Sequence, residues 1–295
     1  MMGLSLKPSL FLFGKNDPLR MAGATAFFTT FALPPIVFLL ALIFGLVIGR
    51  REMGRGLVQN ISGVLGEDGA GQVRQVIRSI IGFDDSWYVI VPGILFLFFV
   101  ATTLFNVIRT SMNQIWNTGL KEKSGVLFNI SVRLRSFAII VALGILFFAD
   151  IALSSVEAYA GAGFTLIWPE GSFYFKSIIN EIASIIIVAA WFIILFRFIA
   201  DARPPWKACI PGGILTGTLF TIGKVILKIL LINSNVRDVY GASGSFVLIL
   251  LFVFYSSFIL YYGASFIAVY CERMNWPIKL NTQAVSIHTS KDSVQ

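Results

Sequence analysis

The 295-residue chain has a single histidine and two cysteines, so it offers few nitrogen or sulfur ligands for a metal and little thiol chemistry. The histidine, His288, lies in a polar C-terminal tail, so neither a histidine-based metal site nor a catalytic triad can form in the apolar part of the chain. Cys209 and Cys271 fall at the ends of two apolar runs, at a surface where we expect thiols to stay reduced. The sequence therefore predicts no enzyme, no metal and no cofactor.

Charged residues are also scarce, at 13% of the chain, whereas hydrophobic residues make up 57% and the mean hydropathy is +0.83. Soluble domains carry charge on about a quarter of their residues, so this composition indicates an integral membrane protein. The net charge of +8 comes from basic residues that flank the apolar runs, and such residues set orientation in a bilayer. We therefore expect membrane lipids and no nucleic acid as partners. No apolar stretch of signal-peptide length precedes Lys15, so we expect the first span to be retained as an anchor.

Six apolar runs are long enough to cross a hydrocarbon core of about 30 Å, and none alternates with the period of a strand. They cover residues 24–49, 88–108, 136–155, 177–200, 208–232 and 243–270. The sequence therefore predicts an all-α, polytopic membrane protein. Its single membrane domain, residues 24–275, lies between a cytoplasmic N-terminal segment, 1–23, and a polar cytoplasmic tail, 276–295.

The distribution of lysine and arginine orients these spans. One side of the membrane receives 14 of the 23 basic residues, the other side receives 7, and 2 lie within the fifth span. By the positive-inside rule both termini face the cytoplasm. On the opposite side, helical spacing of apolar residues in 57–65 and 73–81 predicts two amphipathic helices, which either cover the bundle or form a lid over a cavity.

Four charged residues fall inside the predicted spans at similar depth. At about 1.5 Å per helical residue, Asp150, Glu181 and Lys224 lie in the outer half of the bilayer, and Lys228 follows one turn further out. Charges in hydrocarbon need partners or water. This charged layer predicts either an ion-pair cluster that holds three helices together or a water-filled cavity whose lysines attract an anion, and the pattern leaves both open.

Prolines and glycines interrupt two of the spans. Pro34 and Pro35, near the middle of the first span, predict a kinked or unwound helix, a feature that often marks transporter binding sites. Pro211 and Gly212 lie at the start of the fifth span, where we expect them to shape how the chain enters the helix. Gly213 and Gly217 form a GxxxG pair that allows close helix contact.

Polar residues share one helix face near the inner end of the second span. Asn106, Arg109 and Asn113 are spaced by three and four, and Trp116 follows them. We interpret them as solvated capping residues followed by an aromatic anchor at the membrane interface.

Several of these segments also carry a family resemblance. They are the run 22–35, Asn113-Gln-Ile-Trp116, Pro211-Gly-Gly213, and Val239-Tyr240-Gly241-Ala242 leading to Tyr262-Gly263-Ala264. In this order and spacing the chain resembles the YihY/virulence factor BrkB family of bacterial inner-membrane proteins. The resemblance implies a multi-pass protein of the inner membrane, and members are discussed as transporters, lipid-translocating proteins or virulence factors. An older family label, tRNA-processing ribonuclease, does not fit, because a metal-dependent nuclease needs clustered histidine and carboxylate ligands.

The leading hypothesis is a transporter or flippase-like exporter of an anionic lipid or solute. Lys224 and Lys228 would bind the anion, and Asp150 or Glu181 would be a proton-coupled carboxylate, since no Walker A sequence for ATP is present. The alternative is a non-transporting envelope scaffold or assembly factor that contacts a homo-oligomer partner or an envelope protein through its outer helices and its tail. A membrane-embedded enzyme is disfavoured because no nucleophile is paired with a base.

Overall fold

The structure is a computed structural model that describes residues 2–48, 71, 74, 87–120, 134, 138–139, 141–146, 169–232, 244–280 and 284–286. Long helices dominate these residues, as the sequence predicts. They are α1 (Met2–Lys15), α2 (Pro18–Ile48), α4 (Trp87–Ile115), α6 (Pro169–Phe198), α7 (Trp206–Ile232) and α9 (Gly244–Arg273). The five helices from α2 onward follow apolar runs of the sequence, and α2, α4 and α7 continue through internal prolines.

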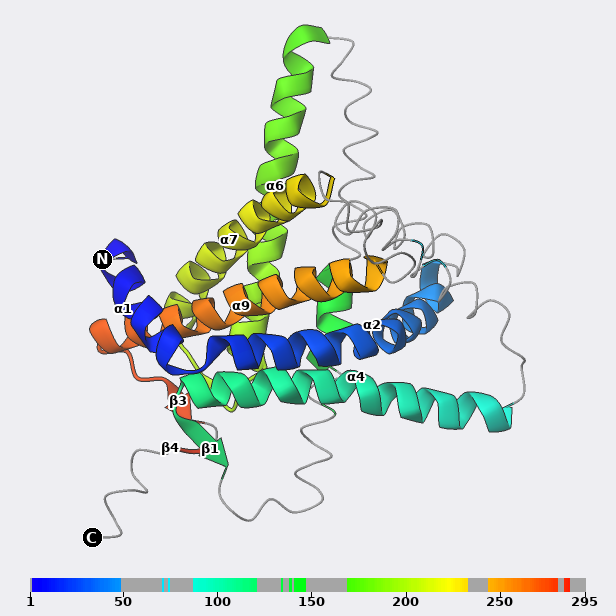
Figure 1. The fold of residues 1–295 in the computed structure, drawn as a ribbon, viewed down its shortest axis with the longest axis horizontal. Helices are drawn as coiled ribbons and strands as arrows, with labels where there is room; N and C mark the ends of the chain where they lie inside the picture. The colour runs from blue at the N-terminus through cyan, green and yellow to red at the C-terminus, as the bar shows by residue number, and fades with distance from the viewer. Residues whose placement is uncertain are drawn as a thin grey trace.

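Short antiparallel strands, which the sequence analysis missed, join the connecting segments to the C-terminal tail. β1 (Thr118–Leu120) pairs with β4 (Ala284–Ser286), and β2 (Ala202–Arg203) pairs with β3 (Lys279–Leu280). With two or three residues each, the strands are too short to leave an alternating pattern. They gather beside the end of α4 (Figure 1), so part of the predicted polar tail is bound to the body of the protein.

Five of the six predicted spans coincide with helices, and the third, 136–155, lies largely outside the described residues. Within the described part, two stretches are long and apolar enough to cross a membrane, namely Trp206–Leu227 in α7 and Val247–Arg273 in α9. Six crossings therefore stay a prediction. The two amphipathic helices predicted at 57–65 and 73–81 also lie outside the described residues, apart from Arg74.

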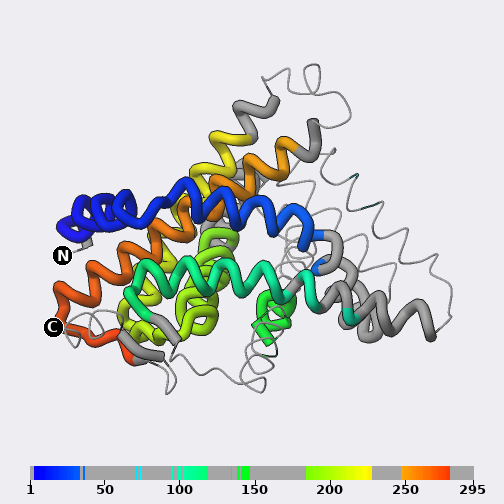
Figure 2. The backbone as a smooth tube through the Cα atoms, turned by 60° about the horizontal axis from the view of Figure 1, so that its bottom comes forward, coloured from blue at the N-terminus to red at the C-terminus, as the bar shows by residue number. Residues whose placement is uncertain are grey.

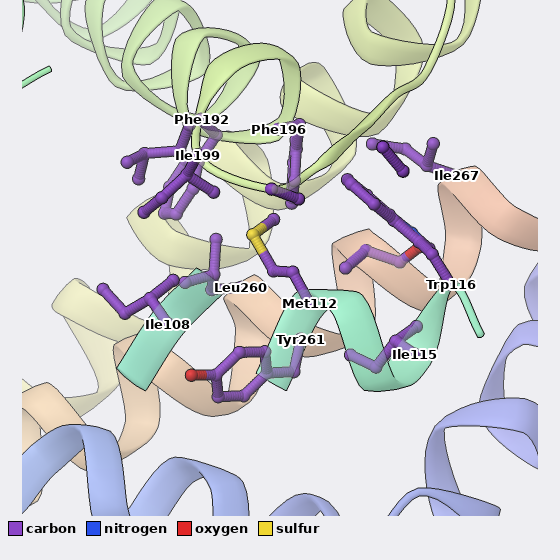
Figure 3. Close-up of a cluster of buried hydrophobic side chains, with 14 of the residues drawn as sticks. Ile108, Met112, Ile115, Trp116, Phe192, Phe196, Ile199, Leu260, Tyr261 and Ile267 are labelled. Atoms are coloured by element: carbon purple, nitrogen blue, oxygen red, sulfur yellow. The ribbon is translucent and has the colours of Figure 1, made fainter. Parts of the chain in front are cut away.

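Helices α2, α4 and α9 run side by side in Figure 1, and α2 contacts both of the others, while Figure 2 shows that α9 crosses α2 at an oblique angle. Helix α6 crosses their direction in Figure 1, and α7 packs against both α6 and α9. The apolar core fills the space between α4, α6 and α9. Figure 3 shows Met112 of α4 between Phe196 and Tyr261, and all three side chains are fully buried.

Glycines set how closely α7 approaches its two neighbours. A Cβ at Gly217 would lie 3.0–3.2 Å from the backbone N, Cα and Cβ of Ala189 on α6, so the two helices touch almost backbone to backbone. Toward α9, Gly212 faces Ile267 and Gly223 faces Tyr255. The close contact predicted for Gly217 is confirmed, and the two pairs on α9 fix an antiparallel register.

The predicted proline features lie inside two of the long helices, α2 and α7. The backbone of α2 is helical from Pro18 to Ile48, so the chain is not unwound at Pro34 and Pro35, and the kink there stays a prediction. Helix α7 begins at Trp206, five residues before Pro211. The backbone is helical through Pro211 and Gly212, so neither residue interrupts α7, and a role for Pro211 in shaping the first turns of the helix stays a prediction.

Candidate functional site

A buried ion pair joins α4 to the segment between α6 and α7. The Nε and Nη2 atoms of Arg109 donate to both carboxylate oxygens of Asp201 at 2.7–3.1 Å. Only 8% of the Arg109 side chain and 4% of the Asp201 side chain are exposed. Fork-shaped guanidinium contacts of this kind are charge-assisted and fix both side chains in one orientation.

Asn113 completes this polar cluster. Its Nδ2 donates to Asp201 Oδ2 at 2.6 Å, and its Oδ1 accepts the backbone N–H of Asp201 at 3.0 Å. The hydroxyl of Thr118 also donates to Asn113 Oδ1, at 3.2 Å. Arg109 and Asn113 are four residues apart on α4, so one helix face presents both to the same carboxylate. We call Arg109, Asn113 and Asp201 the buried polar cluster.

The indole of Trp116 closes the same end of the helix bundle. It is 7% exposed, and its Nε1 donates to the carbonyl oxygen of Ala264 on α9 at 2.9 Å. The interpretation of Arg109, Asn113 and Trp116 as solvated caps and an interfacial anchor is therefore wrong. They pack inside the protein because Asp201 and the Ala264 carbonyl, both distant in sequence, satisfy their polar atoms. Asn106 alone of the set is exposed.

Loss of the indole N–H should be measurable. Trp116→Phe keeps the ring but leaves the buried Ala264 carbonyl without this donor, which costs about 1–3 kcal/mol. We expect a lower free energy of unfolding in a denaturing-detergent titration. Trp206→Phe is the matched control because Trp206 is 47% exposed. Equal losses in the two variants would contradict a specific role for Trp116.

Lys224 is the one member of the predicted charged layer whose side chain the structure describes. It is half-buried on α7, whereas its neighbours Ile222, Val225 and Ile226 are exposed. Seven residues, or about two helical turns, separate it from Gly217, so Lys224 shares the face of α7 that packs on α6. The lysine therefore points toward the protein and away from the exposed apolar face.

The other three layer residues are located less fully. The backbones of Glu181 and Lys228 belong to α6 and α7, which contact each other, but their side chains lie outside the described set, as does Asp150 entirely. Among the described residues no carboxylate forms an ion pair with Lys224. Of the family-motif positions, Tyr240 and Gly241 also lie outside, while Gly263 is buried against Thr216 of α7.

Sequence reasoning missed Asp201. It is the single acid between Arg197 and Lys207, a stretch that we had used only as a set of basic residues for orientation. Its partner on α4 is 92 residues away. One signal could have pointed to a buried acid, namely an arginine on the same helix face as two asparagines. Their side chains can bind a buried carboxylate as well as water.

Ligands for a metal are not assembled in the part of the chain that the structure covers. No three His, Cys, Asp or Glu side chains gather there. Cys209 and Cys271 are free and buried. The polar cluster has one carboxylate and a guanidinium already bound to it, so its chemistry is that of a closed structural contact and not of a cation site.

Apolar helices with exposed isoleucine and phenylalanine side chains, two of them in the described part of the chain long enough to cross a membrane, are typical of helical membrane proteins. A family model described as virulence factor BrkB matches residues 12–287, and the chain belongs to this family. The resemblance drawn from the sequence motifs is thereby confirmed.

Two curated relatives carry the name UPF0761 membrane protein. One, from Psychrobacter sp. (strain PRwf-1), is 25% identical over 253 residues, which cover 83% of this chain and 44% of the relative. The other, from Teredinibacter turnerae (strain ATCC 39867 / T7901), is 24% identical over 287 residues, covering 90% of this chain and 60% of the relative. The chain thus spans about half the length of these relatives. No solved structure matches it significantly.

Proposed function

We propose that the chain is a transporter or flippase-like exporter of an anionic lipid or solute. In this proposal six spans cross the bacterial inner membrane, with both termini in the cytoplasm, and Lys224 lies on the substrate pathway. The observation that carries the proposal is a half-buried lysine on the protein-facing side of a helix that is apolar enough to span a membrane. An ionisable residue at such a position is a candidate functional residue because its burial is costly.

The packing of α6 on α7 supports a charged site near Lys224. Ala189 lies opposite Gly217, and the helices are antiparallel neighbours. If this antiparallel register continues for seven more residues, Lys224 of α7 lies opposite position 182 of α6, which is next to Glu181. A lysine and a carboxylate at one level can form a polar pathway through hydrocarbon, and an anion can compete with the carboxylate for the lysine.

In this proposal, the end of the bundle that carries the buried polar cluster faces the cytoplasm, and the substrate enters from the other side. The buried polar cluster holds α4 to the α6–α7 segment, and Trp116 holds α4 to α9. These contacts lie at the end of the bundle away from the Lys224 level, so they would keep that end packed without occupying the lysine.

Reconstitution in liposomes tests the proposal. We expect the protein to accelerate inward and outward exchange of fluorescent phosphatidylglycerol, or of a labelled organic anion, more than that of phosphatidylcholine. Lys224→Gln should reduce this rate by about tenfold or more, since a hydrogen bond to a charged group contributes about 1.5–3 kcal/mol. Lys224→Arg should retain most of the rate because it keeps the charge.

Lys279→Gln is the matched control, because Lys279 is exposed in β3 and its loss changes the net charge equally. Unfolding of Lys224→Gln must be measured beside transport. If transport survives while thermal stability falls, Lys224 has only a helix-pairing role and the proposed pathway is wrong. No accelerated movement of any substrate by the unmodified protein would also count against it.

The scaffold alternative draws less support from the described residues. It would use the C-terminal tail as a contact surface, but Lys279–Leu280 and Ala284–Ser286 already pair with β2 and β1. A crosslinking experiment that returned one stoichiometric envelope protein would favour it.

A further inference from the structure

The N-terminal helix α1 has a burial pattern opposite to that of a helix on a water-facing surface. Its buried stripe consists of Ser5 and Ser9, at 1% and 0% exposed, followed by Phe13. Its outer surface carries Leu4, Leu10 and Phe11, of which Phe11 is 79% exposed. Small hydroxyl residues on the inside and large apolar residues on the outside are the arrangement expected when the surroundings are less polar than water.

Contacts with α9 give the depth of α1. The Phe13 ring packs on Phe258 and Tyr262, with ring centroids 4.7 and 5.8 Å apart, and the Tyr262 hydroxyl donates to the Leu6 carbonyl at 3.4 Å. A hydrocarbon core needs about 20 helical residues, and the candidate span of α9 is the 27 residues Val247–Arg273.

Wherever the roughly 20 residues that cross the hydrocarbon are placed within Val247–Arg273, they include residues 254–266. They therefore include both Phe258 and Tyr262. A helix lying free in the cytoplasm would meet α9 near Arg273 instead. Because α1 touches α9 at residues that lie in hydrocarbon wherever the bilayer is centred, α1 itself is at hydrocarbon depth.

Charge favours the lipid as the neighbour of the outer surface. The segment 2–15 contains Lys7 and Lys15, both exposed, and no acid. Lysine stems can lie along apolar surface while their ammonium groups reach the head groups, which are anionic in many bacterial lipids. The corner between α1 and α2 lies beside the end of α4, where Arg20 donates to Gln114 at 3.1 Å, so the leaflet concerned is the one at that end.

We propose that α1 is embedded in this leaflet as a lipid-contacting helix, with Leu4, Leu10 and Phe11 among the acyl chains and the lysines at the head groups. Helix α1 is then part of the membrane domain, in contrast to the sequence-based assignment of residues 1–23 to the cytoplasm. The inference holds whether or not the protein transports a substrate.

Depth-dependent quenching of a fluorophore tests this in the full-length protein. A bimane label is placed at Phe11→Cys, on the outer surface of α1, and in a second protein at Lys279→Cys, on exposed β3. The unmodified protein provides the blank, because Cys209 and Cys271 are buried. Liposomes carry a lipid with a nitroxide on its acyl chain, and iodide serves as the aqueous quencher.

We expect nitroxide lipid to quench the label at position 11 several-fold more than the label at 279, and iodide to show the reverse order. Strong iodide quenching at position 11, equal to that at 279, would overturn the proposal. Protection of position 11 from both quenchers would overturn it too, because the outer surface would then be covered by protein, such as a second copy. A label at Leu10→Cys should behave as at position 11, which guards against a local defect in either variant.

Discussion

Asp201→Ala is expected to lower the free energy of unfolding by about 3–5 kcal/mol, the cost of leaving a buried arginine without its carboxylate. Arg109, whose side chain is only 8% exposed, would keep its charge without a carboxylate partner, and Asn113 would lose an acceptor as well. The measurement is a denaturing-detergent titration of the purified protein followed by circular dichroism. Because the pair bridges α4 and the α6–α7 segment, we also expect a broader transition in Asp201→Ala as the two parts separate.

A double-mutant cycle separates the ion pair from general damage at the site. Arg109→Leu with Asp201→Ala removes both charges, so it should cost less than the sum of the single changes, by a coupling energy of about 0.5–3 kcal/mol. Arg20→Ala is the matched control. It breaks a contact of 4.0 Å with Asp17, between side chains that are 63% and 74% exposed, and an exposed hydrogen bond to Gln114, and such exposed contacts contribute little. Additive single changes, or an Asp201→Ala loss no larger than that of Arg20→Ala, would show that the pair does not hold the helices.

The polar cluster also marks where sequence reasoning reached its limit. Apolar runs and small residues act locally, so the helices α2, α4, α6, α7 and α9 and the close approach at Gly217 could be predicted. An arginine near the end of a span has the same local pattern whether water or a distant carboxylate neutralises it. The partner of Arg109 could therefore not be chosen from one sequence.

The two short strand pairs were beyond prediction for a related reason. A two- or three-residue strand such as Ala202–Arg203 has no period to detect, and its position is set by the tail that returns to it. The charged layer is a different case. Lys224 faces the protein, as either a substrate-binding or a helix-pairing residue would. Its place in one charged layer with Asp150, Glu181 and Lys228 stays a prediction from the sequence.

Gly217→Leu is expected to have the second large effect, because α6 and α7 have no space for a side chain at their contact. Even the Cβ would lie 3.0–3.2 Å from the backbone N, Cα and Cβ of Ala189, and that backbone cannot rotate away as a side chain would. Overpacking of this kind costs about 1–3 kcal/mol, so the free energy of unfolding should fall by that amount or more.

Gly23→Leu in α2 provides the opposite case, since no atom lies within 4 Å of a Cβ built at Gly23. Replacing an open helical glycine adds intrinsic helix stability of about 0.5–1 kcal/mol, so this variant should unfold at the same or higher denaturant concentration. The two leucine variants are therefore expected to change stability in opposite directions. A shared sign would mean that α6 moves aside at little cost. In that case the α6–α7 contact would not be rigid enough to define the charged site that we propose between Glu181 and Lys224.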